Sequence, residues 1–124
     1  MKQKRPVNLD LTTFKFPPMA IASILHRLSG VVLFLFFPGM LYLLSRSLRS
    51  QASFEDVLSW LSNPLIKLSL WIFCAALVYH LLAGIRHLLM DVGFGEGLPA
   101  GRRTAVFVII MAIISTILLG IWIW

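Results

Sequence analysis

The sequence predicts an all-α membrane protein with three transmembrane helices, and three observations lead to this fold class. First, 59% of the 124 residues are hydrophobic, only 13% are charged, and the mean hydropathy is +0.89. Second, a soluble domain of this length buries only part of its apolar surface, so it could not hide so many apolar side chains. Third, the chain holds three apolar segments, each long enough to cross a hydrocarbon layer roughly 30 Å thick. We therefore expect a single membrane-anchor domain over residues 1–124.

The first apolar segment follows a basic arm. Residues 1–18 are too polar to cross a bilayer, and we expect them to lie in the cytoplasm. The Pro17-Pro18 pair suits the first turn of a helix, so the first transmembrane helix is predicted over about 19–44. Pro38-Gly39 lies within this span and predicts a kink, which neighbouring helices tolerate inside a membrane.

A short amphipathic helix is predicted after the first span. Phe54, Val57, Leu58 and Leu61 recur at i, i+3, i+4 and i+7, and polar residues occupy the opposite side. A helix of this kind lies in the membrane–water interface, where the amphipathic ring of Trp60 would serve as an anchor.

The two remaining spans are predicted over about 64–90 and about 104–124. Asn63-Pro64 begins the second span, and the closing residues WIW of the third belong at a membrane–water boundary. The linker at 92–103 contains four glycines and one proline, so we expect no continuous helix through it.

Basic residues predict the orientation in the membrane. Eight lie on the side of the amino-terminal arm and three on the other: Lys2, Lys4, Arg5, Lys15, Arg27, Arg86, Arg102 and Arg103 against Arg46, Arg49 and Lys67. This asymmetry places the amino terminus in the cytoplasm and the carboxy terminus outside. The net charge of +6 comes from residues beside apolar segments, as orientation signals and lipid contacts do, so we expect no nucleic-acid partner.

The end of the second span carries ionisable residues where a membrane helix rarely does. A charge at the bilayer centre costs a few kcal/mol on insertion scales, so polar groups there usually face the protein interior and have a function. His80, Gly84 and His87 fall on one helix face at i, i+4 and i+7. Gly84 lacks a side chain between the two imidazoles, which leaves room for a second helix or a flat macrocycle against the backbone.

A second polar stripe lies on the first span. Ser23, His26, Arg27 and Gly30 occur at i, i+3, i+4 and i+7, and we expect them to face His80 near the cytoplasmic surface. Hydroxyl, imidazole and guanidinium groups at one depth suit a ligand with an apolar body and a polar or anionic head, such as a quinone or a haem. Arginine pairs with carboxylates through two parallel hydrogen bonds, which suits haem propionates.

Each of these residues also has a simpler interpretation. His80 could be a packing histidine bonded to a neighbouring carbonyl, and Ser23 could bond to its own helix backbone. Arg27, Arg86 and His87 could extend to lipid phosphates, which we consider the better explanation for Arg86. We find no compact zinc-ligand cluster, no nucleophile–base pair and no phosphate-binding loop in the sequence.

Two ordered sequence signatures resemble the family of cytochrome b membrane-anchor subunits of bacterial succinate dehydrogenase. The first is Arg5-Pro6 with the following VNLDL, and then SILHRLS at 23–29. The second is HLLAGIRHLLMDVG at 80–93. The resemblance covers essentially the whole chain, including the arm and three spans, and signatures of this length are specific.

The resemblance implies roles for particular residues. His80 matches the axial ligand of haem b, so it would bind the haem iron, with a second axial histidine supplied by a partner anchor subunit. Ser23 and Arg27 match residues that line the ubiquinone site. The haem propionates and pocket are implied to contact His26, Arg27, Gly84 and His87.

The resemblance also implies a function, partners and a location. The chain would be one of two anchors in a helical bundle of the bacterial inner membrane, bound to an iron–sulfur subunit and a flavoprotein subunit. It would pass electrons from succinate oxidation to ubiquinone. Three alternatives stay open: an anchor of fumarate reductase, a cytochrome b with His26 as its own second haem ligand, and a non-redox assembly protein.

Overall fold

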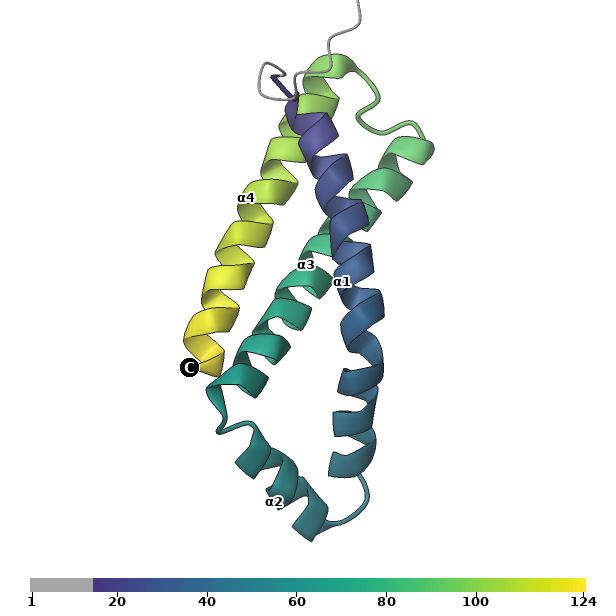
Figure 1. Cartoon of the computed structure of the whole chain (residues 1–124). Coiled ribbons are helices and arrows are strands. Elements are labelled where there is room, and N and C mark those ends of the chain that lie inside the picture. The colour runs from purple at the N-terminus through teal and green to yellow at the C-terminus, as the bar shows by residue number, and fades with distance from the viewer. Residues whose placement is uncertain (1–14) are drawn as a thin grey trace, which may run out of the picture.

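The computed structural model describes residues 15–124, which form four helices (Figure 1). These are α1 (Pro18–Ser47), α2 (Gln51–Trp60), α3 (Pro64–Asp91) and α4 (Leu98–Ile123). Within this part of the chain α1, α3 and α4 are each long and apolar enough to cross a membrane, and no strand occurs. The predicted fold class is therefore confirmed. Most of the basic arm, residues 1–14, lies outside the described residues.

Helix α3 lies between the other two long helices and packs against both of them, while α1 and α4 also meet at the end where each begins (Figure 1). The contacts are built largely from small side chains, because the buried apolar residues are four alanines and two valines: Ala22, Val57, Ala83, Ala105, Val108 and Ala112. Small residues allow close approach of helix backbones inside a membrane. The larger Leu, Ile and Phe side chains mostly point outward, where lipid or further helices can cover them.

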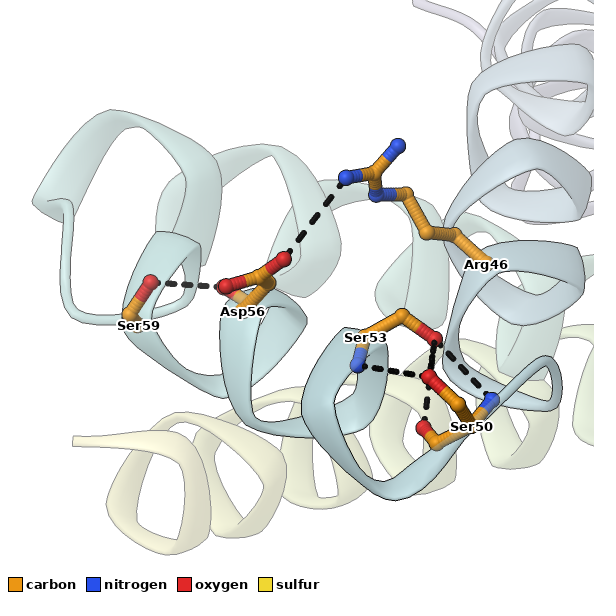
Figure 2. Close-up of polar contacts among 5 residues, drawn as sticks. All are labelled: Arg46, Ser50, Ser53, Asp56 and Ser59. Atoms are coloured by element: carbon orange, nitrogen blue, oxygen red, sulfur yellow. Dashed lines mark hydrogen bonds and ion pairs between the residues drawn. The ribbon is translucent and has the colours of Figure 1, made fainter.

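The predicted amphipathic helix is α2, which turns the chain between α1 and α3. Ser50 and Ser53 form a reciprocal capping box, in which each side chain binds the backbone N–H of the other (Figure 2). Arg46, in the last turn of α1, reaches Asp56 of α2 at 3.6 Å (Figure 2). Its guanidinium also lies over the Trp60 ring, 5.1 Å from the ring centroid. These contacts fix α2 against the end of α1 and hold the Trp60 ring next to a cation.

The proline at position 38 does not end α1, which is helical on both sides of it. The loop between α3 and α4 differs from the expectation, because α4 begins at Leu98 and not near Thr104. Only residues 92–97 break the helix, with Gly93 and Gly95 at positive φ angles of 92° and 79°. Pro99 is compatible with the helix because it occupies the first turn, where no intrahelical N–H is needed.

Candidate functional site

Three histidines stack where α1 crosses α3. The ring of His26, from α1, lies parallel to that of His80, with centroids 4.2 Å apart and an interplanar angle of 17°. It also lies parallel to the ring of His87, at 5.5 Å and again 17°. His80 and His87 are seven residues apart on α3, a rise of about 10.5 Å, so the His26 ring lies between them. The two predicted polar stripes therefore do meet.

The His26 ring packs over Gly84 of α3. A Cβ atom at position 84 would lie 3.7 Å from His26 Nε2, an ordinary van der Waals contact. The space predicted beside Gly84 is thus filled by a side chain of the second helix. The Nε2 atom of His26 is buried and has no hydrogen-bond partner among residues 15–124. An unpaired buried nitrogen is costly in an apolar setting, which makes it a candidate contact for a bound group.

His80 is held against α1 at three points. Its Nδ1 atom lies 3.0 Å from Ser29 Oγ and 3.3 Å from the His26 carbonyl oxygen. A Cβ atom at Gly30 would lie 3.3 Å from His80 Cε1, so α1 approaches the ring closely because position 30 has no side chain. The neighbouring Tyr79 donates its O–H to the Ala22 carbonyl at 2.8 Å and ties the same helices together. His80 therefore contributes to packing through Nδ1, and no described residue bonds to its Nε2.

Ser23 and Arg27 lie on the same helix one turn apart, but they differ in exposure. Ser23 is half-buried and Arg27 is exposed. Neither side chain makes a hydrogen bond or ion pair with the residues that the structure describes. The simpler interpretation of Ser23, a bond to its own helix backbone, therefore finds no support there. Within residues 15–124, their donors have no partner.

Arg86 is not at the lipid surface, which corrects our preferred interpretation from the sequence. Only 7% of this residue is exposed. Its Nε atom donates to Thr104 Oγ1 and a terminal nitrogen donates to the Gly101 carbonyl, both at 3.1 Å. The sequence prediction missed these bonds because it placed Gly101 in an irregular linker, whereas both partners lie in the first turns of α4. Arg86 therefore connects α3 to α4.

Ser29 was not among the predicted site residues, although it belongs to the first signature. It is 6% exposed and donates its O–H to the His26 carbonyl at 2.8 Å. Its place in that signature was the available signal, because its partner ring, His80, lies 51 residues further along the chain.

The geometry at the crossing suits a site in which one imidazole is the ligand, and not one in which several side chains surround a metal ion. Among residues 15–124, no group of three or more His, Cys, Asp or Glu side chains could hold a metal ion. The His26, His80 and His87 rings face one another, so their nitrogens do not converge on one point. One imidazole projecting from a rigid helix is sufficient to supply an axial haem ligand.

The fold and the site define a multi-pass helical membrane protein with an intramembrane histidine cluster. The chain belongs to the succinate dehydrogenase/fumarate reductase transmembrane subunit family, whose profile matches residues 1–119. It is 54% identical, over the full length of both chains, to the succinate dehydrogenase cytochrome b556 subunit of Coxiella burnetii. The Rickettsia prowazekii and Paracoccus denitrificans proteins of that name are 35% and 30% identical. Those matches cover 95% and 92% of this chain, and 92% and 88% of the relatives. The resemblance seen in the two signatures is therefore confirmed.

Proposed function

We propose that this chain is the haem b-binding and ubiquinone-binding membrane anchor of a succinate dehydrogenase. In this role it passes electrons from succinate oxidation to ubiquinone, in the tricarboxylic acid cycle and aerobic respiration. The observation that carries the proposal is the His80 imidazole, fixed through Nδ1 at the α1–α3 crossing of a chain that belongs to this family. The relatives named above are cytochrome b556 subunits, and a cytochrome b holds a haem.

The described residues fit a haem of the b type. His80 presents an imidazole whose Nε2 is not used in packing, and His26 presents a buried Nε2 that lacks a partner. His80 would be the axial ligand, with the second axial histidine supplied by a partner anchor subunit. Arg27, His26 and His87 would contact the propionates or form the pocket wall, with Gly84 behind the His26 ring. When bound, the haem would supply a one-electron redox centre.

Ser23 and Arg27 would bind the quinone. They stand one turn apart on α1, so a hydroxyl and a guanidinium can donate to the same carbonyl oxygen. Donors already in place when negative charge develops on that oxygen stabilise the reduced form without reorganisation. The exposure of Arg27 leaves it free to complete a site shared with other subunits.

The proposed assembly holds a second membrane anchor, an iron–sulfur subunit and a flavoprotein subunit. It sits in a bacterial inner membrane with the amino terminus of this chain in the cytoplasm and its carboxy terminus in the periplasm, as the basic residues predict. An anchor of fumarate reductase is the second candidate, because the family description covers both enzymes. The two run in opposite physiological directions.

The test is a reduced-minus-oxidised visible spectrum of the complex purified from membranes, combined with identification of the co-purifying chains. We expect a b-type α band and the three named partners. If the partner chains co-purify but no haem band is seen, the anchor function stands and the ligand role of His80 is ruled out. A preparation with neither would leave a non-redox membrane protein and overturn the proposal.

A further inference from the structure

The hydroxyl of Ser29 is placed to control the protonation pattern of the His80 ring. A serine hydroxyl has one hydrogen to donate and lone pairs with which to accept. Ser29 donates that hydrogen to the His26 carbonyl, at 2.8 Å. With its hydrogen given to the carbonyl, Ser29 Oγ acts as the acceptor in its 3.0 Å contact with His80 Nδ1, and Nδ1 acts as the donor.

A second contact leads to the same tautomer. The His26 carbonyl oxygen lies 3.3 Å from His80 Nδ1, and a carbonyl oxygen can only accept. The contacts with Ser29 and with the carbonyl are satisfied together when Nδ1 carries the hydrogen. A neutral imidazole with its hydrogen on Nδ1 carries its lone pair on Nε2.

We propose that Ser29 is a positioning residue for His80: it holds the Nδ1–H tautomer and ring orientation that leave Nε2 free to bind the haem iron. This inference rests on the proposed function. Histidines that bind a metal usually donate their other ring N–H to a nearby acceptor, and that bond fixes the tautomer and makes the ring a better ligand. Ser29 supplies such an acceptor from another helix, at a buried position.

The adjacent residue completes the support. Gly30 lets α1 approach His80 Cε1, the atom bonded to Nδ1, so Ser29 and Gly30 act on neighbouring atoms of one ring. Ser47 offers a comparison on the same helix. Its hydroxyl donates to the carbonyl three residues before it at 2.8 Å, as the Ser29 hydroxyl does, but among the described residues it makes no hydrogen bond to another helix. Both serines bond to their own helix backbone, but of the two only Ser29 also bonds to His80.

The experiment compares Ser29→Ala, Ser29→Cys and the matched control Ser47→Ala in the purified holo-complex. Two quantities are measured: the rate at which haem transfers to an excess of apomyoglobin, and the midpoint potential of the haem. Loss of a ligand's hydrogen-bond partner commonly costs 10–100-fold in metal affinity. We expect Ser29→Ala to speed haem transfer about tenfold, the lower end of that range, since the His26 carbonyl still accepts from Nδ1.

The potential should rise in Ser29→Ala, because a weaker acceptor at Nδ1 makes His80 a poorer electron donor to oxidised iron. Ser29→Cys keeps the side-chain volume but offers a weak acceptor, so it should resemble Ser29→Ala. Ser47→Ala should match the wild type in both quantities.

A Ser29→Cys complex that behaves as wild type while Ser29→Ala is perturbed would show that packing volume matters, and would overturn the proposal. So would two Ser29 variants that both match Ser47→Ala. A wild-type complex without haem would instead remove the proposed ligand role of His80, and this inference with it.

Discussion

The imidazole rings of His26 and His80 stack face to face across the α1–α3 crossing, 4.2 Å apart and 17° from parallel. Two axial ligands of one haem must stand on opposite sides of the porphyrin, with their nitrogens directed at the iron. Rings in direct face contact leave no room for a macrocycle between them. This relationship argues against the alternative in which His26 is the second ligand within this chain, and favours a ligand from a partner subunit.

Replacing the two histidines one at a time separates these assignments. We expect His80→Ala to abolish the b-type spectrum of the purified complex, because no other imidazole of this crossing replaces it. His26→Ala should keep a six-coordinate b-type spectrum with weaker haem retention, because only a pocket contact is lost. The measurement is the reduced-minus-oxidised spectrum per mole of flavin. Loss of the spectrum in both variants would favour the single-chain haem.

The quinone assignment predicts a separation of two activities. Arg27→Ala should lower the rate of ubiquinone reduction roughly 100-fold, as removal of a preorganised donor typically does, and Ser23→Ala should lower it less. Succinate oxidation with an artificial dye should change little, because that reaction needs no quinone. Arg49→Ala is the matched control, since this arginine is also exposed and lies in the turn after α1, away from the crossing. Equal loss of both activities, with less assembled complex, would indicate a role in assembly instead.

The buried Arg86 predicts a stability effect. Arg86→Met keeps much of the apolar stem but removes the bonds to Thr104 and Gly101, and we expect it to cost about 2 kcal/mol of stability. Arg103→Met, an exposed arginine of α4, is the control and should cost little. The measurement is the fraction of purified complex that stays intact after heating, determined by gel filtration for each of the two variants. Equal losses of stability in the two variants would show that the bonds from Arg86 to α4 contribute little to stability.

The helices and the two polar stripes could be predicted from the sequence because each depends on local pattern: apolar length, helical spacing and basic residues at span ends. The roles of Arg86 and Ser29 could not be predicted, because they depend on contacts between two helices. Arg86 was misassigned because its partners lie on α4, whose first turn contains a proline and a glycine that resemble a loop. Ser29 was missed because its importance comes from a ring 51 residues away, which no spacing rule on one helix identifies.

Two glycines of α1 provide the last prediction. A Cβ atom at Gly39 would meet nothing within 4 Å, whereas one at Gly30 would lie 3.3 Å from His80 Cε1. Gly39→Ala should therefore stabilise the complex by about 0.5–1 kcal/mol, the usual gain for replacing glycine inside a helix. Gly30→Ala gains the same helix propensity but forces His80 or α1 to shift by a few tenths of an ångström, so it should alter the haem midpoint potential and weaken haem retention. Thermal stability and redox titration of both variants measure the difference. A Gly30→Ala complex whose haem behaves as in Gly39→Ala would show that the close approach of α1 does not constrain the His80 ring.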